Sequence, residues 1–331
     1  MTAKKKQYQK WAFGEIFFII ASFFLLLLLL KNPTLAADAV SSALLQCAKL
    51  LIPSLFPIMV ASEIAVESGA AELITRPLNG LLSRALGVKK EAASPYFLGL
   101  LGGYTTSVCG TLSLYKSGRI SKEDCERMIA LSSLPSLSFL TGFVGSGIFK
   151  NTTVGWILWA ISVFSTLILG FLTRKRHTKG TFEAEGICST ARDEKCEKAT
   201  CKSPLSASKI IVGAISHSAS AMIVICACVV FFSTLISVLH YPFDALRISE
   251  NMQKLTFGAL EITSGISSTA SISPLSMRAA SCGFFIGWSG LSVHFQIISL
   301  CDGYGLSFKK YFIYKTIQGA ICCLIAWVVF R

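Results

Sequence analysis

The chain has 331 residues, of which 53% are hydrophobic and only 15% charged, and its mean hydropathy is +0.61. This balance excludes an ordinary soluble domain and predicts an all-α integral membrane protein. The formal net charge of +13 raises the alternative of a nucleic-acid partner. However, the lysines and arginines lie in short loops between apolar runs, without a basic face that carries interleaved aromatic residues. They therefore indicate membrane topology, and we expect no nucleic acid as a partner.

Residues 1–43 are predicted to hold an N-terminal transmembrane helix and a connection. Four lysines within Met1–Lys10 precede an apolar run from Trp11 to Leu30, long enough to cross a bilayer core of about 30 Å. A signal peptide has a shorter apolar core and a small-residue cleavage site. We therefore interpret this run as a retained helix with its N-terminus inside.

Residues 44–173 are predicted to form a first repeat with an extra transmembrane helix. Pro53 and Pro57 should break or kink the apolar run Leu44–Val66. Leucines alternate with basic residues in Gly69–Glu91, a pattern typical of an amphipathic helix on the inner membrane surface.

The next stretch, Ser94–Tyr115, contains the glycine-rich sequence Gly102–Gly110 and lies between basic loops. Polar, non-helical backbone is tolerated at membrane depth only where protein or a water-filled cavity satisfies its hydrogen bonds. We therefore expect a re-entrant hairpin that enters from the inside.

A helix is predicted to begin at Ser121, with Asp124 three residues later as its capping acid. This helix should break around Pro135 and resume through Phe139–Phe149. A clean span from Val154 to Leu172 follows, and the basic residues after it fix that end inside.

The second half of the chain follows a hydrophilic segment of mixed charge, residues 174–209, which we interpret as a flexible basic linker in the cytoplasm. Residues 210–331 are predicted to form a second repeat. Its parts are a span within Ile210–Leu239, a mostly outside segment that contains Lys254–Ile266, a second re-entrant hairpin at Ala279–Cys301 and a last span at Phe308–Phe330.

The two glycine-rich stretches suggest a duplication. Ile120-Ser121 aligns with Leu306-Ser307 at an offset that places Gly103 against Ser289, and Ser107 against Val293. On the predicted topology most lysines and arginines lie inside, and the two repeats enter the membrane from opposite sides. We therefore predict an inverted repeat with discontinuous helices, an arrangement typical of transporters.

The breaks in such helices suit a small organic anion, because the N-termini of half-helices carry partial positive charge. The candidate substrate-binding residues come from both stretches, from the break near Pro135 and from the surroundings of Glu261: Gly103, Tyr104, Thr105, Thr106, Ser107, Ser132, Ser133, Ser136, Glu261, Thr263, Ser264, Ser289, Gly290, Ser292, His294 and Gln296.

Each candidate has a structural alternative. The small residues could simply allow helices to approach closely, and His294 could be a satisfied core histidine or could bind substrate or carry a proton. Glu261 is favoured because an ionisable group at membrane depth is expensive. Its neighbours Thr263, Ser264 and Gly265 suggest another broken helix, although the segment could be interfacial. Coupling to Na⁺ or H⁺ stays open, and no metal or other cofactor is expected.

The twelve cysteines are expected to be structural or incidental. Seven of them, Cys47, Cys109, Cys226, Cys228, Cys282, Cys322 and Cys323, lie in apolar segments, where a thiol packs as a small hydrophobic group. Three more, Cys188, Cys196 and Cys201, lie in the basic linker with spacings that do not match a zinc framework.

An enzyme is disfavoured, because the sequence lacks HExxH, GxSxG, a P-loop and an acidic metal cluster. An intramembrane hydrolase that uses Ser107 and His294 would also lack a third, orienting group.

At several motifs the chain resembles the YlbJ-type (SpoVV) sporulation integral membrane proteins, which contain the nucleoside-recognition Gate domain. The resemblance runs from about Leu44 to Ala326. It is most specific at LFPIMVASE (Leu55–Glu63), GLLGGY (Gly99–Tyr104), GRISKEDCERM (Gly118–Met128), LEITSGI (Leu260–Ile266) and SGLSVHFQ (Ser289–Gln296).

This resemblance implies a polytopic protein of the bacterial cell membrane, similar in plan to concentrative nucleoside transporters, that moves dipicolinate across the outer forespore membrane. Two departures fall in the implied substrate region. The chain has Gly103-Tyr104-Thr105-Thr106 where the family tends to have GYP, and Ser132-Ser133-Leu134-Pro135 where it tends to have NNxxP.

We therefore expect a transporter of a small organic anion, most favourably dipicolinate, that works by alternating access at paired hairpin tips. A transporter of nucleosides or other small metabolites and a non-transporting scaffold of a sporulation complex are the alternatives. The lipid bilayer is an expected partner, and a homo-oligomer is left open.

Overall fold

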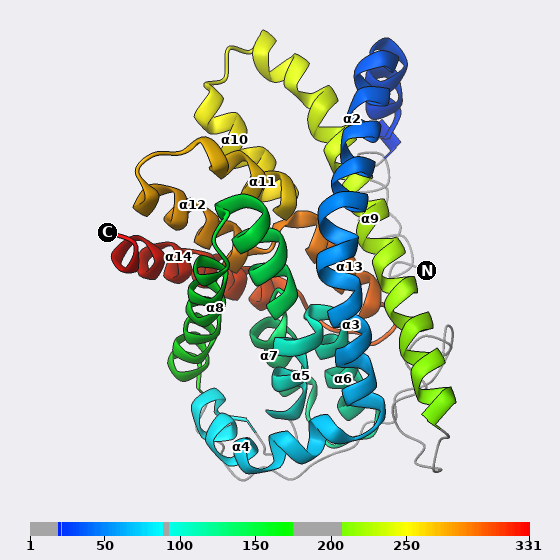
Figure 1. Ribbon diagram of the computed structural model, residues 1–331, viewed down its shortest axis with the longest axis vertical. Coiled ribbons are helices and arrows are strands. Elements are labelled where there is room, and N and C mark those ends of the chain that lie inside the picture. Colours follow the sequence, from blue (N-terminus) through cyan, green and yellow to red (C-terminus); the bar gives the residue numbers. More distant parts are fainter. Residues whose placement is uncertain (1–18, 21, 89–92, 175–206) are drawn as a thin grey trace, which may run out of the picture.

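The computed structural model describes residues 19–20, 22–88, 93–174 and 207–331 (Figure 1). The predicted N-terminal lysines and nearly all of the predicted linker lie outside these residues. Within the described part the regular elements are all helical. Five stretches are long and apolar enough to cross a membrane: Pro33–Glu67, Thr152–Leu172, Ala207–Ala245, Leu275–Leu300 and Lys309–Val329. The predicted class, an all-α integral membrane protein, is confirmed.

A continuous helical rod forms one side of the molecule. After the helix Ser22–Lys31, it comprises α2 (Pro33–Gln46), a π-helical stretch (Cys47–Leu51) and α3 (Ile52–Glu67). The rod does not break at its prolines: Pro53 lies in the first turn of α3, directly after the π-helical stretch, and Pro57 lies inside α3. It packs along α9 (Ala207–Ala245), as Figure 1 shows.

The predicted amphipathic helix and the first hairpin are both present. The first is α4 (Ala70–Leu86). The hairpin consists of α5 (Ser94–Gly102) and α6 (Tyr104–Lys116), which pack side by side and join at Gly103. The turn requires a glycine there, because Gly103 has a φ of +83°.

A discontinuous helix follows, as predicted. It begins with α7 (Lys122–Ser132), where the Asp124 N–H donates to the Ser121 hydroxyl at 3.1 Å and confirms the predicted cap. Residues 133–136 are not helical, and the chain resumes in a π-helix, Phe139–Phe149. This π-helix packs against the span α8 (Thr152–Leu172).

The second hairpin lies earlier in the chain than predicted. It is formed by α10 (Glu250–Leu260) and α11 (Ile262–Ser268). The two arms touch at their backbones, since a Cβ atom built on Gly265 would lie 2.6 Å from the Gly258 Cα. Residues seven apart in one straight helix would be about 10 Å apart. The chain therefore reverses direction at Glu261.

The prediction of a hairpin at Ala279–Cys301 is wrong. That stretch forms α12 (Leu275–Trp288) and α13 (Gly290–Leu300), which do not pack side by side. Instead α12 packs along α14 (Lys309–Val329), where a Cβ atom on Gly287 would lie 2.6 Å from the Gly319 Cα. Leu275–Leu300 also forms one stretch long enough to cross a membrane, so α13 is the second part of a discontinuous helix interrupted at Ser289.

The alignment of Gly103 with Ser289 therefore does not match equivalent positions. The two parts of the chain instead share one order of elements: a hairpin (α5–α6 or α10–α11), a discontinuous helix (α7 with Phe139–Phe149, or α12–α13) and a span (α8 or α14). The inverted orientation of the two parts and the re-entry of the hairpins remain predictions.

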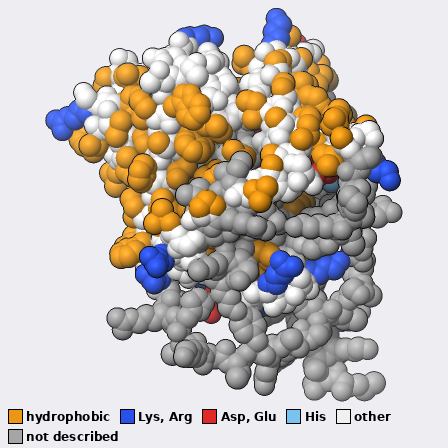
Figure 2. All heavy atoms as spheres, turned by 60° about the horizontal axis from the view of Figure 1, so that its bottom comes forward, with side chains coloured by type: hydrophobic (Ala, Val, Ile, Leu, Met, Phe, Trp, Pro, Cys, Tyr) orange, Lys and Arg blue, Asp and Glu red, His pale blue; other side chains and the backbone are white. Residues whose placement is uncertain are grey.

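The outer surface suits lipid. Large apolar side chains are strongly exposed on several spans, among them Phe164 and Phe171 on α8, Val212 and Ile223 on α9 and Leu324 on α14. Figure 2 shows such side chains over much of one face, with Lys and Arg toward its edges. Exposed apolar surface on this scale is costly in water, so these faces are expected to contact the bilayer.

Candidate functional site

A cavity with an empty volume of about 720 Å³ lies where four helix interruptions meet. Two interruptions are the hairpin tips at Gly103 and Glu261, and two are the breaks of the discontinuous helices at Pro135 and Ser289. The described lining residues are Leu51, Leu55, Met59, Gly102, Gly103, Tyr104, Thr105, Pro135, Ser136, Phe139, Ile225, Cys228, Val229, Glu261, Ile262, Thr263, Ser289, Ser292, Val293 and Gln296.

In the first part of the chain the hairpin tip rests on the helix break. A Cβ atom on Gly103 would lie 3.3 Å from the Ser136 Cβ, so a larger residue would push the two apart. The Ser136 hydroxyl in turn accepts the Phe139 N–H at 3.3 Å and bonds the Ser138 hydroxyl at 2.9 Å. These bonds hold the restart of the helix beside the tip.

In the second part the tip is held by Glu261, which is only 1% exposed. Its carboxylate accepts the Thr263 N–H at 3.0 Å, the Ser264 N–H at 2.6 Å and the Thr263 hydroxyl at 2.5 Å. Glu261 is thus the N-cap of α11, where a negative charge meets the positive end of the helix. Its depth in the membrane, and with it the interfacial alternative, stays a prediction.

The tip at Glu261 also touches the break of the other discontinuous helix. A Cβ atom on Gly290 would lie 2.8 Å from the Ile262 nitrogen, and the Trp288 indole N–H donates to the Ala259 carbonyl at 2.9 Å. Ser289 and Gly290 both have positive φ, at +75° and +77°. Each hairpin tip therefore contacts the break of its own discontinuous helix.

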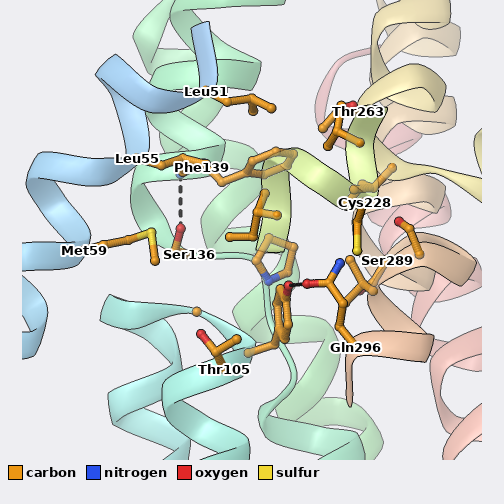
Figure 3. Close-up of a pocket in the computed structure, with 18 of the residues that line it drawn as sticks. Leu51, Leu55, Met59, Thr105, Ser136, Phe139, Cys228, Thr263, Ser289 and Gln296 are labelled. Carbon is orange, nitrogen blue, oxygen red and sulfur yellow. Dashed lines mark hydrogen bonds between the residues drawn. The ribbon is translucent and has the colours of Figure 1, made fainter. Parts of the chain in front are cut away.

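A hydrogen bond joins the two parts across the cavity. The Tyr104 hydroxyl, at the start of α6, donates to the Gln296 Oε1 on α13 (Figure 3). The bond links residues 192 positions apart in the sequence. It fixes the first hairpin against the second discontinuous helix.

We expect Tyr104→Phe to weaken this link without changing the packing of the ring. A neutral hydrogen bond contributes about 1 kcal/mol net, so the unfolding midpoint should fall by about 2 °C. Thermal unfolding followed by tryptophan fluorescence in detergent measures the shift. Tyr241→Phe, at an exposed ring, is the matched control, and equal midpoints for the two variants would contradict the role of the bond.

The cavity has an apolar side and a polar side (Figure 3). Leu51, Leu55 and Met59 of the rod form one wall. Thr263, Ser289 and Gln296 come from the opposite elements, and Glu261 is the acidic residue among the described lining residues. Such a cavity suits a small ligand with a flat apolar body and polar edges.

The predicted site residues divide into two groups. Gly103, Tyr104, Thr105, Ser136, Glu261, Thr263, Ser289, Ser292 and Gln296 line the cavity. Thr106, Ser107, Ser132, Ser133, Ser264, Gly290 and His294 do not. Among the latter, Ser132 and Ser133 donate their hydroxyls to carbonyls of their own helix, and Gly290 supports the tip at Glu261.

His294 lies behind the cavity. It is 0% exposed, its Nδ1 bonds the Tyr311 hydroxyl at 2.7 Å, and its ring packs edge-on against Trp288. Its Nε2 has no hydrogen-bond partner, and neither does the Ser107 hydroxyl, so the two do not bond each other. His294 is therefore neither part of the cavity lining nor a fully satisfied core histidine, and its role stays a prediction.

Sequence reasoning missed the apolar wall of the cavity, which comes from α3 and α9. Leu55 and Met59 on α3, and Ile225, Cys228 and Val229 on α9, line it. Their apolar character is the same as that of lipid-facing residues on the same helices. The π-helical stretches that end at Leu51 and begin at Phe139 lie beside the cavity, and no sequence pattern announces them.

One group of described side chains could hold a metal ion. The ligand atoms of Glu63, Glu67 and His217 lie within 4.8 Å of one another, and His217 Nδ1 is 3.2 Å from Glu63 Oε1. Glu63 and Glu67 belong to α3 and His217 to α9, at positions that do not line the cavity. At these distances the group is also a plain ion pair when the imidazole is protonated, and we assign it no ligand.

The described cysteines are all free thiols. Cys47, Cys282 and Cys322 are buried, in keeping with a packing role, and Cys228 lines the cavity. The three linker cysteines, Cys188, Cys196 and Cys201, lie outside the described residues.

The described residues define an all-helical integral membrane protein with a cavity lined at four helix interruptions. The chain is 24% identical to the sporulation integral membrane protein YlbJ of Bacillus subtilis (strain 168), over 93% of this chain and 82% of that protein. This similarity supports a place among the YlbJ-type proteins, in agreement with the motifs in the sequence. No family model matches the chain, and no solved structure matches it.

Proposed function

We propose that this protein transports a small organic anion across the membrane, with the cavity as its binding site. The supporting observation is the meeting of four helix interruptions at one cavity. In transporters, interrupted helices place backbone groups at membrane depth where a substrate can use them. Its similarity to a sporulation integral membrane protein is consistent with a membrane role in sporulation.

The preference for an anion rests on two helix N-termini. Tyr104 and Thr105 in the first turn of α6, and Ser292 in the first turn of α13, line the cavity, and neither turn contains an acidic residue. The first N–H groups of a helix have no partner within it and attract negative charge. The N-terminus of α11 is unavailable, because Glu261 already caps it.

Dipicolinate is the substrate to test first. It combines a flat aromatic ring with two carboxylates, which suits a cavity with one apolar and one polar side. The resemblance to YlbJ-type proteins implies the same substrate. A nucleoside also has a flat ring and polar edges, and the carboxylate of Glu261 would repel it less than a dianion.

The test is uptake of radiolabelled dipicolinate into proteoliposomes that contain the purified protein, with nucleosides as competitors. Ser292→Leu places a large side chain in the polar side of the cavity and should reduce uptake at least about tenfold, ~1.4 kcal/mol. Ser299→Leu is the matched control, because Ser299 lies on the same helix and is exposed.

Three results would change the conclusion. Equal uptake by the two leucine variants would remove the cavity as the binding site. Nucleoside uptake without dipicolinate uptake would favour the nucleoside alternative. No uptake of either compound, with Na⁺ or proton gradients in both directions, would leave a membrane scaffold in sporulation as the better proposal.

A further inference from the structure

Lys315 is a buried lysine within a membrane span. It lies on α14 and is 0% exposed. Its Nζ donates to the Ser133 carbonyl at 2.9 Å and to the Gln318 Oε1 at 2.8 Å. Among the described residues, no carboxylate forms an ion pair with it. Ionisable side chains in membrane spans are expensive and are usually retained for function.

The acceptor of Lys315 is one of the groups that the helix break sets free. Ser133 is the C-cap residue of α7. Because the helix does not continue beyond it, no helical N–H is placed to bond the Ser133 carbonyl. The end of α7 also carries the partial negative charge of the helix dipole. Carbonyls at such a break are the groups with which membrane transporters bind coupling cations.

The break that Lys315 holds forms part of the cavity wall. Pro135 and Ser136 lie two and three residues after Ser133 in the chain, and both line the cavity. Ser136 also supports the hairpin tip at Gly103. A charge at the Ser133 carbonyl therefore acts on the geometry of the candidate site, although Lys315 does not line it.

The polar groups around Lys315 are arranged for a cation at this position. Gln318 turns its oxygen toward the ammonium, and its Nε2 is left buried without a hydrogen-bond partner. Gln318 thus accepts a bond from Lys315 while its own Nε2 donor is unused, an arrangement that favours the lysine as the local donor.

We propose that Lys315 is a resident cation of the protein: its ammonium occupies the cation position at the break of α7, so that this break needs no Na⁺. The occupancy of that position does not depend on the proposed function. The consequence for transport rests on the proposed function: uptake of the anion does not require Na⁺ at this break.

The test uses the full chain in detergent and in proteoliposomes. Lys315→Ala removes the ammonium and leaves space beside the Ser133 carbonyl, so the unfolding midpoint should fall by at least about 5 °C. Methylammonium, which resembles the end of the lysine side chain, should restore more than about half of the loss. Tetramethylammonium at the same concentration is too large and has no N–H group to donate, so it should not restore the loss.

Two further variants separate charge from packing. Lys315→Met fills the space with an apolar chain, so it should lose stability and should not respond to methylammonium. Lys310→Ala, at an exposed lysine that pairs with Glu123, should show neither effect. A Lys315→Met protein with the wild-type midpoint, or a Lys315→Ala protein rescued equally by both amines, would overturn the resident cation. The Met variant decides the matter if the Ala variant does not accumulate.

In proteoliposomes, wild-type uptake of dipicolinate should be the same within about twofold with Na⁺ or with choline outside, since a twofold change corresponds to only ~0.4 kcal/mol. Uptake that requires Na⁺ and is unaffected by Lys315→Ala would overturn the proposed consequence. Absence of uptake in every condition would instead contradict the proposed function and leave the stability test of Lys315 standing.

Discussion

Glu261→Ala is expected to abolish uptake and to lower the free energy of unfolding by at least about 3 kcal/mol. The carboxylate accepts two backbone N–H groups and the Thr263 hydroxyl at a site that is 1% exposed. Loss of hydrogen bonds to a charged group, with buried donors left unpaired, costs about 1.5–3 kcal/mol for each strong contact. The hairpin tip beside the cavity would then no longer be fixed.

Thermal unfolding and dipicolinate uptake of the same preparations check this prediction. Glu261→Gln keeps one acceptor oxygen and should lose only about 1–2 kcal/mol, because a neutral acceptor makes weaker bonds. Glu250→Ala is the matched control, since this glutamate lies in the first turn of α10 and pairs with Lys254 on the exposed side. A Glu261→Ala protein as stable as the control would contradict the capping role.

Gly290→Ala is expected to have the second large effect, a loss of about 3 kcal/mol of unfolding free energy. A non-glycine residue at a φ of +77° costs about 1–2 kcal/mol. The new Cβ atom would also lie 2.8 Å from the Ile262 backbone nitrogen, and overpacking against a rigid neighbour costs about 1–3 kcal/mol. The contact between the hairpin tip and the start of α13 would have to open.

Gly303→Ala separates these two costs. Gly303 has a φ of +84°, yet nothing lies within 4 Å of a Cβ atom built there. This variant should therefore lose only the conformational part, about 1–2 kcal/mol. The difference between the unfolding midpoints of the two variants measures the tip contact, and equal midpoints would show that the contact contributes nothing.

The sequence was informative wherever a local rule decides the structure. Composition identified the membrane class, the Ser121 and Asp124 pair located the start of α7, and Pro135 located its break. The glycine at 103 located the first hairpin tip, because a reversal at that point needs a positive φ. These signals lie within a few residues of the feature they predict.

The second hairpin shows where local rules fail. Ser289-Gly290 has the composition of a tip but is the break of a discontinuous helix, whereas the residues around Glu261 suggest a broken helix and not the reversal of direction found there. Gly258 and Gly265, which let the two arms cross at backbone contact, were the signal that could have found it. A positive φ indicates that the chain bends at a residue, but contacts with other helices decide whether the chain reverses direction there.

The sequence by itself therefore determined that this chain is a helical membrane protein with interrupted helices, and it indicated most of the polar residues of the cavity. Only the tertiary structure decided which interruptions are tips, which apolar residues of α3 and α9 face the cavity, and that Lys315 holds the Ser133 carbonyl. Apolar residues on a membrane helix have the same sequence pattern whether they face lipid or a cavity. Contacts between residues more than a hundred positions apart, such as Tyr104 with Gln296, depend on packing that no local pattern records.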